Sequence, residues 1–179
     1  MSSAFLKNET AEDPVFIPAR APLPSGTTNY VTPRGLALLR DELTELEAQH
    51  ARVQSSDSEA SGRMRQLAEL NGRIGLLNQR IATAKVVESH AQPANEVRFG
   101  ATVTLRTVSS MVNTQQTIGS ERRLTIVGVD EADASHGLIA FTAPIARAMQ
   151  GKRIGDTVTL RMGRGEDVME VVDILYKDA

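Results

Sequence analysis

The feature that most constrains this fold is a pair of leucine-rich stripes within residues 32–88. Each stripe steps alternately by three and four residues, which keeps its apolar side chains on one face of a helix. The first stripe contains Leu36, Leu39, Leu43, Leu46 and Val53, and the second contains Leu67, Leu70, Ile74, Leu77, Ile81 and Ala84. The small, polar run over 54–62 is typical of a turn. The sequence therefore predicts an antiparallel coiled-coil hairpin whose stripes bury each other.

The first helix has a clear start, because Thr32 is a good N-cap and Pro33 tolerates the missing N–H of the first turn. We expect this helix to run to about Val53. Its exposed face is acidic and that of the second helix is basic, with Asp41, Glu42, Glu45 and Glu47 facing Arg63, Arg65, Arg73 and Arg80. Oppositely charged arms predict ion pairs that fix the register. The alternative is that the basic arm lines a surface for nucleic acid or a protein partner.

Composition excludes several classes of protein. The absence of Cys rules out disulfides and zinc–thiolate sites, and no histidine has carboxylates at metal-ligand spacing, so no metal site is expected. An aromatic content of 3% without Trp argues against a surface that stacks single-stranded nucleic acid. A net charge of −2 argues against a dedicated DNA or membrane-surface binder. Without a membrane-spanning run or a signal peptide, we expect a cytoplasmic protein.

The chain divides into three segments. Residues 1–30 are polar and proline-rich, and we expect a disordered or extended tail. Residues 31–89 form the hairpin. Residues 90–179 begin with a linker to 96 and then change to the two-residue period of strands, with a long hairpin loop expected over 109–120. The expected strands cover 97–105, 124–127, 138–141, 158–160 and 168–174, with a short helix over Pro144–Met149. The class is α+β: a helical hairpin followed by a small domain of four or five antiparallel strands.

The C-terminal part of the chain contains four short motifs in a fixed order: FGATVT at 99–104, IVGVDEAD at 126–133, PIARAM at 144–149 with Gly151 and Lys152, and Gly155 with Asp156. These motifs, in this order, resemble the Gre family of bacterial transcription elongation factors. The run YVTPRGL at 30–36 resembles the start of the family's coiled coil, closer to the GreB branch. The resemblance covers the chain from Tyr30 to the C-terminus, and ordered motifs in two domains are more specific than one short match.

The resemblance implies an FKBP-like C-terminal domain that docks on RNA polymerase at the rim of its secondary channel. The coiled coil would enter the channel, where acidic tip residues help to hold the second Mg²⁺ and a water while the polymerase cleaves backtracked RNA. In that two-metal chemistry the catalyst is the polymerase. The factor alone is then not an enzyme and needs no cofactor of its own, and nucleic acid is met only within the transcription complex.

The sequence departs from the family at the tip. Cleavage factors of the family carry a motif of the type Gly-Asp-Leu-x-Glu-Asn-Ala-Glu-Tyr, which is missing here, and only Asp57 and Glu59 remain as tip candidates. The hairpin is also shorter than that of the family, by about three helical turns summed over its two arms, which would leave its tip short of the catalytic Mg²⁺. The alternative is that both carboxylates are ordinary solubilising loop residues.

The docking motif of the family is matched more completely in this sequence than the tip motif is. The matching residues are Ala143, Pro144, Ile145, Ala146 and Arg147, together with the acidic run Asp130, Glu131 and Asp133. Ala143 stands where the family usually has Ser, so one hydrogen bond is lost. Alternatively, Pro144 and Ile145 only start and pack the short helix, and the acidic run is a solvated turn.

The leading hypothesis is a non-enzymatic, polymerase-binding elongation factor that modulates elongation or pausing, or competes with other channel-binding factors. The first alternative is a cleavage-stimulating factor that acts through Asp57 and Glu59. A regulator resembling Rnk and a prolyl isomerase are further alternatives, although a fold alone does not carry an activity. We expect a monomer, while pairing of the stripes between two chains would give an oligomer.

Overall fold

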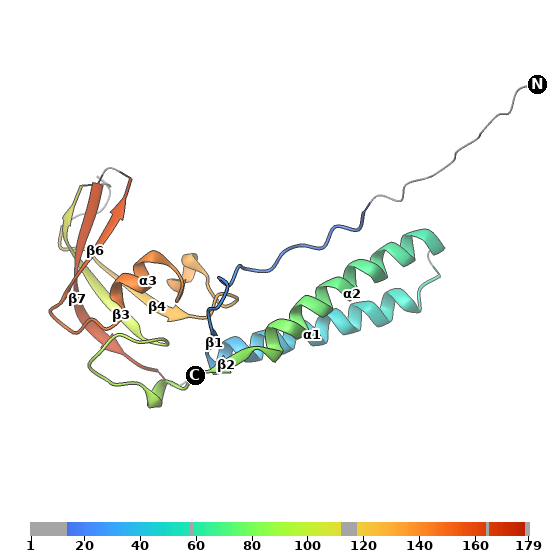
Figure 1. The fold of residues 1–179 in the computed structure, drawn as a ribbon, viewed down its shortest axis with the longest axis horizontal. Coiled ribbons are helices and arrows are strands. Elements are labelled where there is room, and N and C mark those ends of the chain that lie inside the picture. Colours follow the sequence, from blue (N-terminus) through green and yellow to red (C-terminus); the bar gives the residue numbers. More distant parts are fainter. Residues whose placement is uncertain (1–13, 58, 112–117, 164, 178–179) are drawn as a thin grey trace, which may run out of the picture.

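The computed structural model describes residues 14–57, 59–111, 118–163 and 165–177. A helical hairpin extends from one end of a sheet domain, and the tip of the hairpin is the point farthest from that domain (Figure 1). The predicted α+β class, with the helices first and the sheet second, is confirmed.

The hairpin consists of α1 (Pro33–Gln54) and α2 (Ala60–Ala82). As predicted, Thr32 caps α1, and its Oγ1 accepts a hydrogen bond of 2.8 Å from the Gly35 N–H. The two stripes form one core, in which the most buried side chains are Leu39, Leu46, Leu70 and Leu77. The turn is shorter than predicted, because α2 already begins at Ala60. Ala84, which we expected on the helical stripe, lies instead in a strand but still packs on this core.

The prediction of ion pairs between the two arms was wrong. Within the described residues, no ion pair joins α1 to α2. Glu45 pairs with Arg52 of its own helix at 3.0 Å, while Glu42 and Arg80 pair with groups outside the hairpin. The leucine stripes, not opposite charges, therefore hold the register of the hairpin.

A two-stranded parallel ribbon forms the base of the hairpin, where β1 (Asn29–Val31) pairs with β2 (Ala84–Val86). Successive side chains of a strand point to opposite faces. Val31 accordingly packs into the hairpin core, whereas the ring of Tyr30 contacts the rings of Phe99 and Phe141 in the sheet domain, at centroid distances of 5.8 and 5.7 Å. This three-residue strand thus joins two hydrophobic cores.

The sheet domain has five strands in the order β5-β4-β3-β7-β6. They are β3 (Thr102–Ser110), β4 (Glu121–Val127), β5 (Leu138–Ala140), β6 (Thr157–Met162) and β7 (Gly165–Leu175), and the helix α3 (Pro144–Met149) contacts the same core. Short 3-10 turns η1 (Ser89–Ala91) and η2 (Ala134–His136) complete the described elements.

Two details of the predicted sheet were wrong. The first strand begins at Thr102 instead of Val97, because Gly100 at φ +87° reverses the chain; Val97 and Phe99 are buried in the preceding loop. The strand β5 pairs with β4 in parallel, so the sheet is not wholly antiparallel. The expected long loop over 109–120 is shortened by β3, which continues to Ser110, and its residues 112–117 lie outside the described part.

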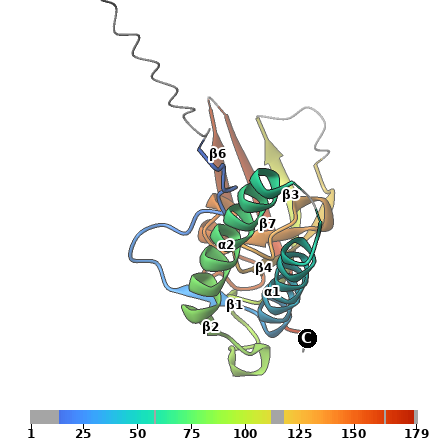
Figure 2. The same ribbon diagram turned by 90° about the vertical axis from the view of Figure 1, so that its right-hand side faces the viewer.

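The N-terminal tail, which we expected to be disordered or extended, is extended over residues 14–24 and then turns at Gly26, where the Thr27 N–H donates to the Pro24 carbonyl at 3.0 Å. It is not free of contacts, because it runs along α2 back to the base of the hairpin (Figures 1 and 2). Residues 1–13 of the predicted tail lie outside the described residues. In the described part of the chain, no helix is both long and apolar enough to span a membrane.

Two neighbouring leucines of α1 test the role of the stripe. Leu39 is 2% exposed in the hairpin core, whereas Leu38 is 44% exposed. We expect Leu39→Ala to lower the free energy of unfolding by about 2–5 kcal/mol, since it removes buried methyl groups and leaves a cavity. Leu38→Ala is the matched control and should cost less than about 1 kcal/mol. Chemical denaturation monitored by circular dichroism measures both, and equal losses would contradict the assigned core.

Candidate functional site

The tip of the hairpin carries the two candidate carboxylates, and both Asp57 and Glu59 are exposed. The turn that holds them is tied by short polar contacts. Ser56 Oγ donates to the Val53 carbonyl at 2.8 Å, and Arg63 Nη1 donates to the Ser56 carbonyl at 3.0 Å. Glu59 is the N-cap residue of α2, although its side chain makes no capping bond.

A carboxylate at a helix N-terminus is stabilised by the helix dipole, which gives Glu59 a structural role independent of any metal. Among the described residues, no group of three or more His, Asp or Glu side chains is placed to hold a metal ion. Of the described residues, the tip turn offers two exposed carboxylates, those of Asp57 and Glu59.

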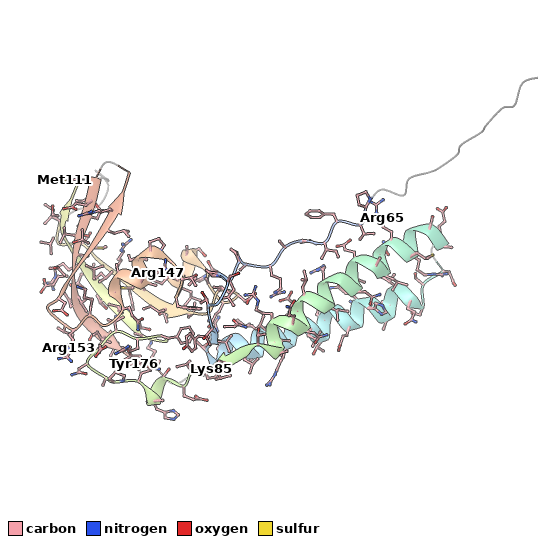
Figure 3. The ribbon with its side chains drawn as sticks, viewed as in Figure 1. Arg65, Lys85, Met111, Arg147, Arg153 and Tyr176 are labelled. Atoms are coloured by element: carbon pink, nitrogen blue, oxygen red, sulfur yellow. The ribbon has the colours of Figure 1, made fainter. Side chains whose placement is uncertain are left out.

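The four arginines proposed for a basic arm differ in burial and in partners. Arg63 closes the tip turn, Arg80 lies at the base of the hairpin in contact with Asp130, and Arg65 is exposed towards the tip (Figure 3). Arg73 is half-buried beside the N-terminal segment. Two of the four, Arg63 and Arg80, thus have partners within the chain.

The helix α3 presents only part of the docking motif to solvent. Ala146 and Met149 are buried in the domain core, and Ile145 and Ala143 pack partly against it. Pro144 and Arg147 are exposed, and Arg147 lies on the sheet domain far from the tip (Figure 3). Ala143 is the N-cap residue and makes no side-chain capping bond, as expected where Ala replaces a hydroxyl residue.

The acidic run following β4 has two members in internal contacts. Glu131 is 8% exposed; it accepts hydrogen bonds from Thr32 Oγ1 at 2.5 Å and from Arg34 Nη1 at 3.1 Å. A Cβ on Gly35 would lie 2.7 Å from the Glu131 Oε2, so a larger residue at position 35 would displace this carboxylate. Asp130 pairs with Arg20 and Arg80. Both carboxylates thus attach the hairpin to the sheet domain.

Asp133, the third acidic residue, is exposed. Its Oδ1 accepts hydrogen bonds from the Ser135 hydroxyl at 2.5 Å and the Ser135 N–H at 3.0 Å, and its Oδ2 lies 2.6 Å from His136 Nδ1. The Ser135 hydroxyl, followed by the His136 ring, lowers the pKa of the Asp133 carboxyl to about 2. This side chain therefore carries a negative charge at neutral pH, at the rim of a groove that is also lined by Arg34, Leu38 and His136.

Sequence reasoning missed the contacts made by Arg20, Thr32 and Arg34. Arg20 lies in a segment whose composition indicated no fixed structure, and no local pattern marks it. Thr32 was recognised as a helix cap, but its second bond, to Glu131, depends on a residue 99 positions away. The only signal in the sequence was that Thr32 and Glu131 both fall within motifs of the same family resemblance.

Comparison with known proteins supports the resemblance to the Gre family over most of the chain. The family model "Transcription elongation factor, GreA/GreB, C-term" matches residues 92–176. The transcription elongation factor GreA of Syntrophotalea carbinolica is 33% identical over 159 residues, which are 82% of this chain and 96% of that protein. The transcription elongation factor GreB of Pseudomonas aeruginosa is 34% identical over 173 residues, or 89% of this chain and 97% of that protein.

Among solved structures, the prokaryotic transcription elongation factor GreA/GreB from Nitrosomonas europaea is 24% identical, with a TM-score of 0.39 over 82% of this chain and 98% of that chain. The two curated relatives match both the hairpin and the sheet domain, and GreA and GreB match to a similar degree. On these matches, the chain belongs to the GreA/GreB family of transcription elongation factors.

Proposed function

We propose that this protein binds bacterial RNA polymerase, with its sheet domain at the rim of the secondary channel and its hairpin directed into the channel. It then modulates elongation or pausing, or excludes other channel-binding factors, without being an enzyme itself. Support comes from membership of a family of elongation factors and from one observation on the fold. The hairpin is only two helices wide and, at about 1.5 Å per residue, α2 reaches roughly 35 Å. A polymerase partner would place the protein in the cytoplasm.

The exposed members of the family's docking motif and of the acidic run define the docking surface that we propose. Pro144 and Arg147 on α3 and the charged Asp133 offer one apolar and two charged groups to a partner. Ala146 is left out because it is buried, and Asp130 and Glu131 because their carboxylates bind within the chain. Charged groups at the edge of an interface favour correct orientation and fast association.

The docking surface is tested by Arg147→Ala. We expect the variant to bind core RNA polymerase roughly tenfold more weakly, the effect of truncating an interface arginine that contributes somewhat over ~1 kcal/mol. Fluorescence anisotropy of a labelled protein titrated with core enzyme measures the affinity. Arg161→Ala is the matched control, because Arg161 is exposed on β6 in a pair with Glu166 at 3.6 Å. Unchanged affinity of Arg147→Ala would remove α3 from the interface.

A second candidate function is stimulation of transcript cleavage, and the exposure of Asp57 and Glu59 at the tip favours it. These carboxylates would have to position a Mg²⁺ already bound by the polymerase, which activates a water for attack on the phosphodiester. We rank this function second because the turn lacks the acidic motif of cleavage factors and Glu59 has a place at the N-terminus of α2.

Backtracked transcription complexes separate the two functions. We expect the protein to add no RNA cleavage and to slow cleavage stimulated by an authentic GreA in a concentration-dependent manner, because both factors would occupy one channel. RNA length on a sequencing gel measures the rate. Cleavage that appears with the parent protein and disappears in Asp57→Ala and Glu59→Ala would instead establish the second function.

A further inference from the structure

The N-terminal segment contacts both parts of the molecule through one side chain. The Arg20 guanidinium binds Glu42 of α1 through two bonds, Nη1–Oε1 at 2.8 Å and Nη2–Oε2 at 3.0 Å. The same group binds Asp130 Oδ1 of the sheet domain through Nη2 at 2.9 Å and Nε at 3.1 Å. Arg20 therefore bridges a carboxylate of the hairpin and a carboxylate of the sheet domain.

A second arginine completes this junction from α2. Arg80 Nη1 donates to Asp130 Oδ2 at 3.0 Å, and its Nη2 donates to the Ala21 carbonyl at 2.6 Å. The side chains of Arg20, Arg80 and Asp130 are only 18%, 13% and 9% exposed. Paired charges that are largely removed from water, with bidentate geometry, interact more strongly than exposed surface pairs.

Gly72 of α2 contacts the N-terminal segment at a second point, closer to the tip of the hairpin. A Cβ on Gly72 would lie 2.8 Å from Ile17 Cγ1 and nearer still to Ile17 Cδ1, so the absence of a side chain at Gly72 makes room for Ile17. A Cβ on Gly75, in the next turn of the same helix, would instead point into open space, with no neighbouring group within 4 Å. The segment is thus attached at two points, one apolar and one ionic.

These contacts lie beside the ribbon that also joins the two parts, since the Arg80 carbonyl accepts a hydrogen bond of 2.9 Å from the side chain of Asn29 in β1. The chain passes from the hairpin to the sheet domain after β2, and Tyr30 and Glu131 make further contacts between the two parts. Rotation of the hairpin about this base would move α1 and α2 relative to the loop that carries Asp130. An arginine that binds Glu42 and Asp130 together opposes that rotation.

We propose that residues 15–24 are a latch that fixes the angle between the helical hairpin and the sheet domain. Ile17 holds the segment on α2, and Arg20 joins the two carboxylates across the junction. The latch sets the direction in which the hairpin points from the sheet domain. This property belongs to the free protein and is measured without a polymerase, so its failure and the failure of the proposed function are distinguishable.

The absence of native Cys allows spin labels to be placed at chosen sites. Ala51→Cys on α1 and Thr159→Cys on β6 are both exposed, and double electron–electron resonance between them reports the angle of the hairpin. We expect one narrow distance distribution in the full chain. With Arg20→Gln, the population outside this peak should rise about tenfold, the factor expected for loss of one charge-assisted contact.

Two glycine variants separate the latch from a general effect on α2. Both Gly72→Ala and Gly75→Ala raise helix propensity by a similar amount. Gly72→Ala displaces Ile17, so it should broaden the distribution as Arg20→Gln does, whereas Gly75→Ala should retain the parent distribution. Thermal unfolding by circular dichroism checks that each variant remains folded. Parent-like distributions for both Arg20→Gln and Gly72→Ala would overturn the proposal, as would equal broadening in Gly75→Ala.

Discussion

The structure depends on a strand of three residues whose neighbouring side chains enter different cores. Val31 closes the base of the hairpin core, and Tyr30, the preceding residue, packs against Phe99 and Phe141 of the sheet domain. Alternation along a strand makes this division unavoidable once β1 pairs with β2. A shift of one residue would place each side chain in the wrong core. The hairpin therefore starts from a defined position on the sheet domain.

Polar contacts also hold the hairpin at this position on the sheet domain, and they are made by residues of the family motifs. Thr32 caps α1 and also donates to Glu131, so the start of the helix is bonded to the loop after β4. Gly35 leaves space for the same carboxylate, and at Gly128 a Cβ would approach the Tyr30 carbonyl to 2.9 Å. Residues that resemble the family in two distant parts of the sequence thus meet at one junction. Because burial penalises an unpaired charge, Glu131 and its partners depend on each other.

The same junction divides the molecule into two ends with different chemistry. The tip offers two exposed carboxylates on a short turn, while the sheet domain offers Pro144 and Arg147 on a helix whose other face is buried. Where the angle at this junction is fixed, a contact at one end determines where the other end lies. The docking surface that we propose on the sheet domain and the projecting hairpin would then keep a fixed position relative to each other, and the N-terminal segment adds a further connection between the two parts.

The sequence by itself determined both helices of the hairpin, the cap at Thr32, the short helix at Pro144–Met149 and the order of helices before strands. These features follow from local periodicity and capping, which a linear pattern records. Tertiary structure alone decided which charges pair. Among the described residues, no ion pair joins the acidic arm to the basic arm. Glu42 binds Arg20 and Arg80 binds Asp130, because folding brings together partners that are distant in sequence. The parallel pairing of β5 and the contacts of the proline-rich segment escaped sequence reasoning for the same reason: each depends on surfaces that exist only after the chain has folded.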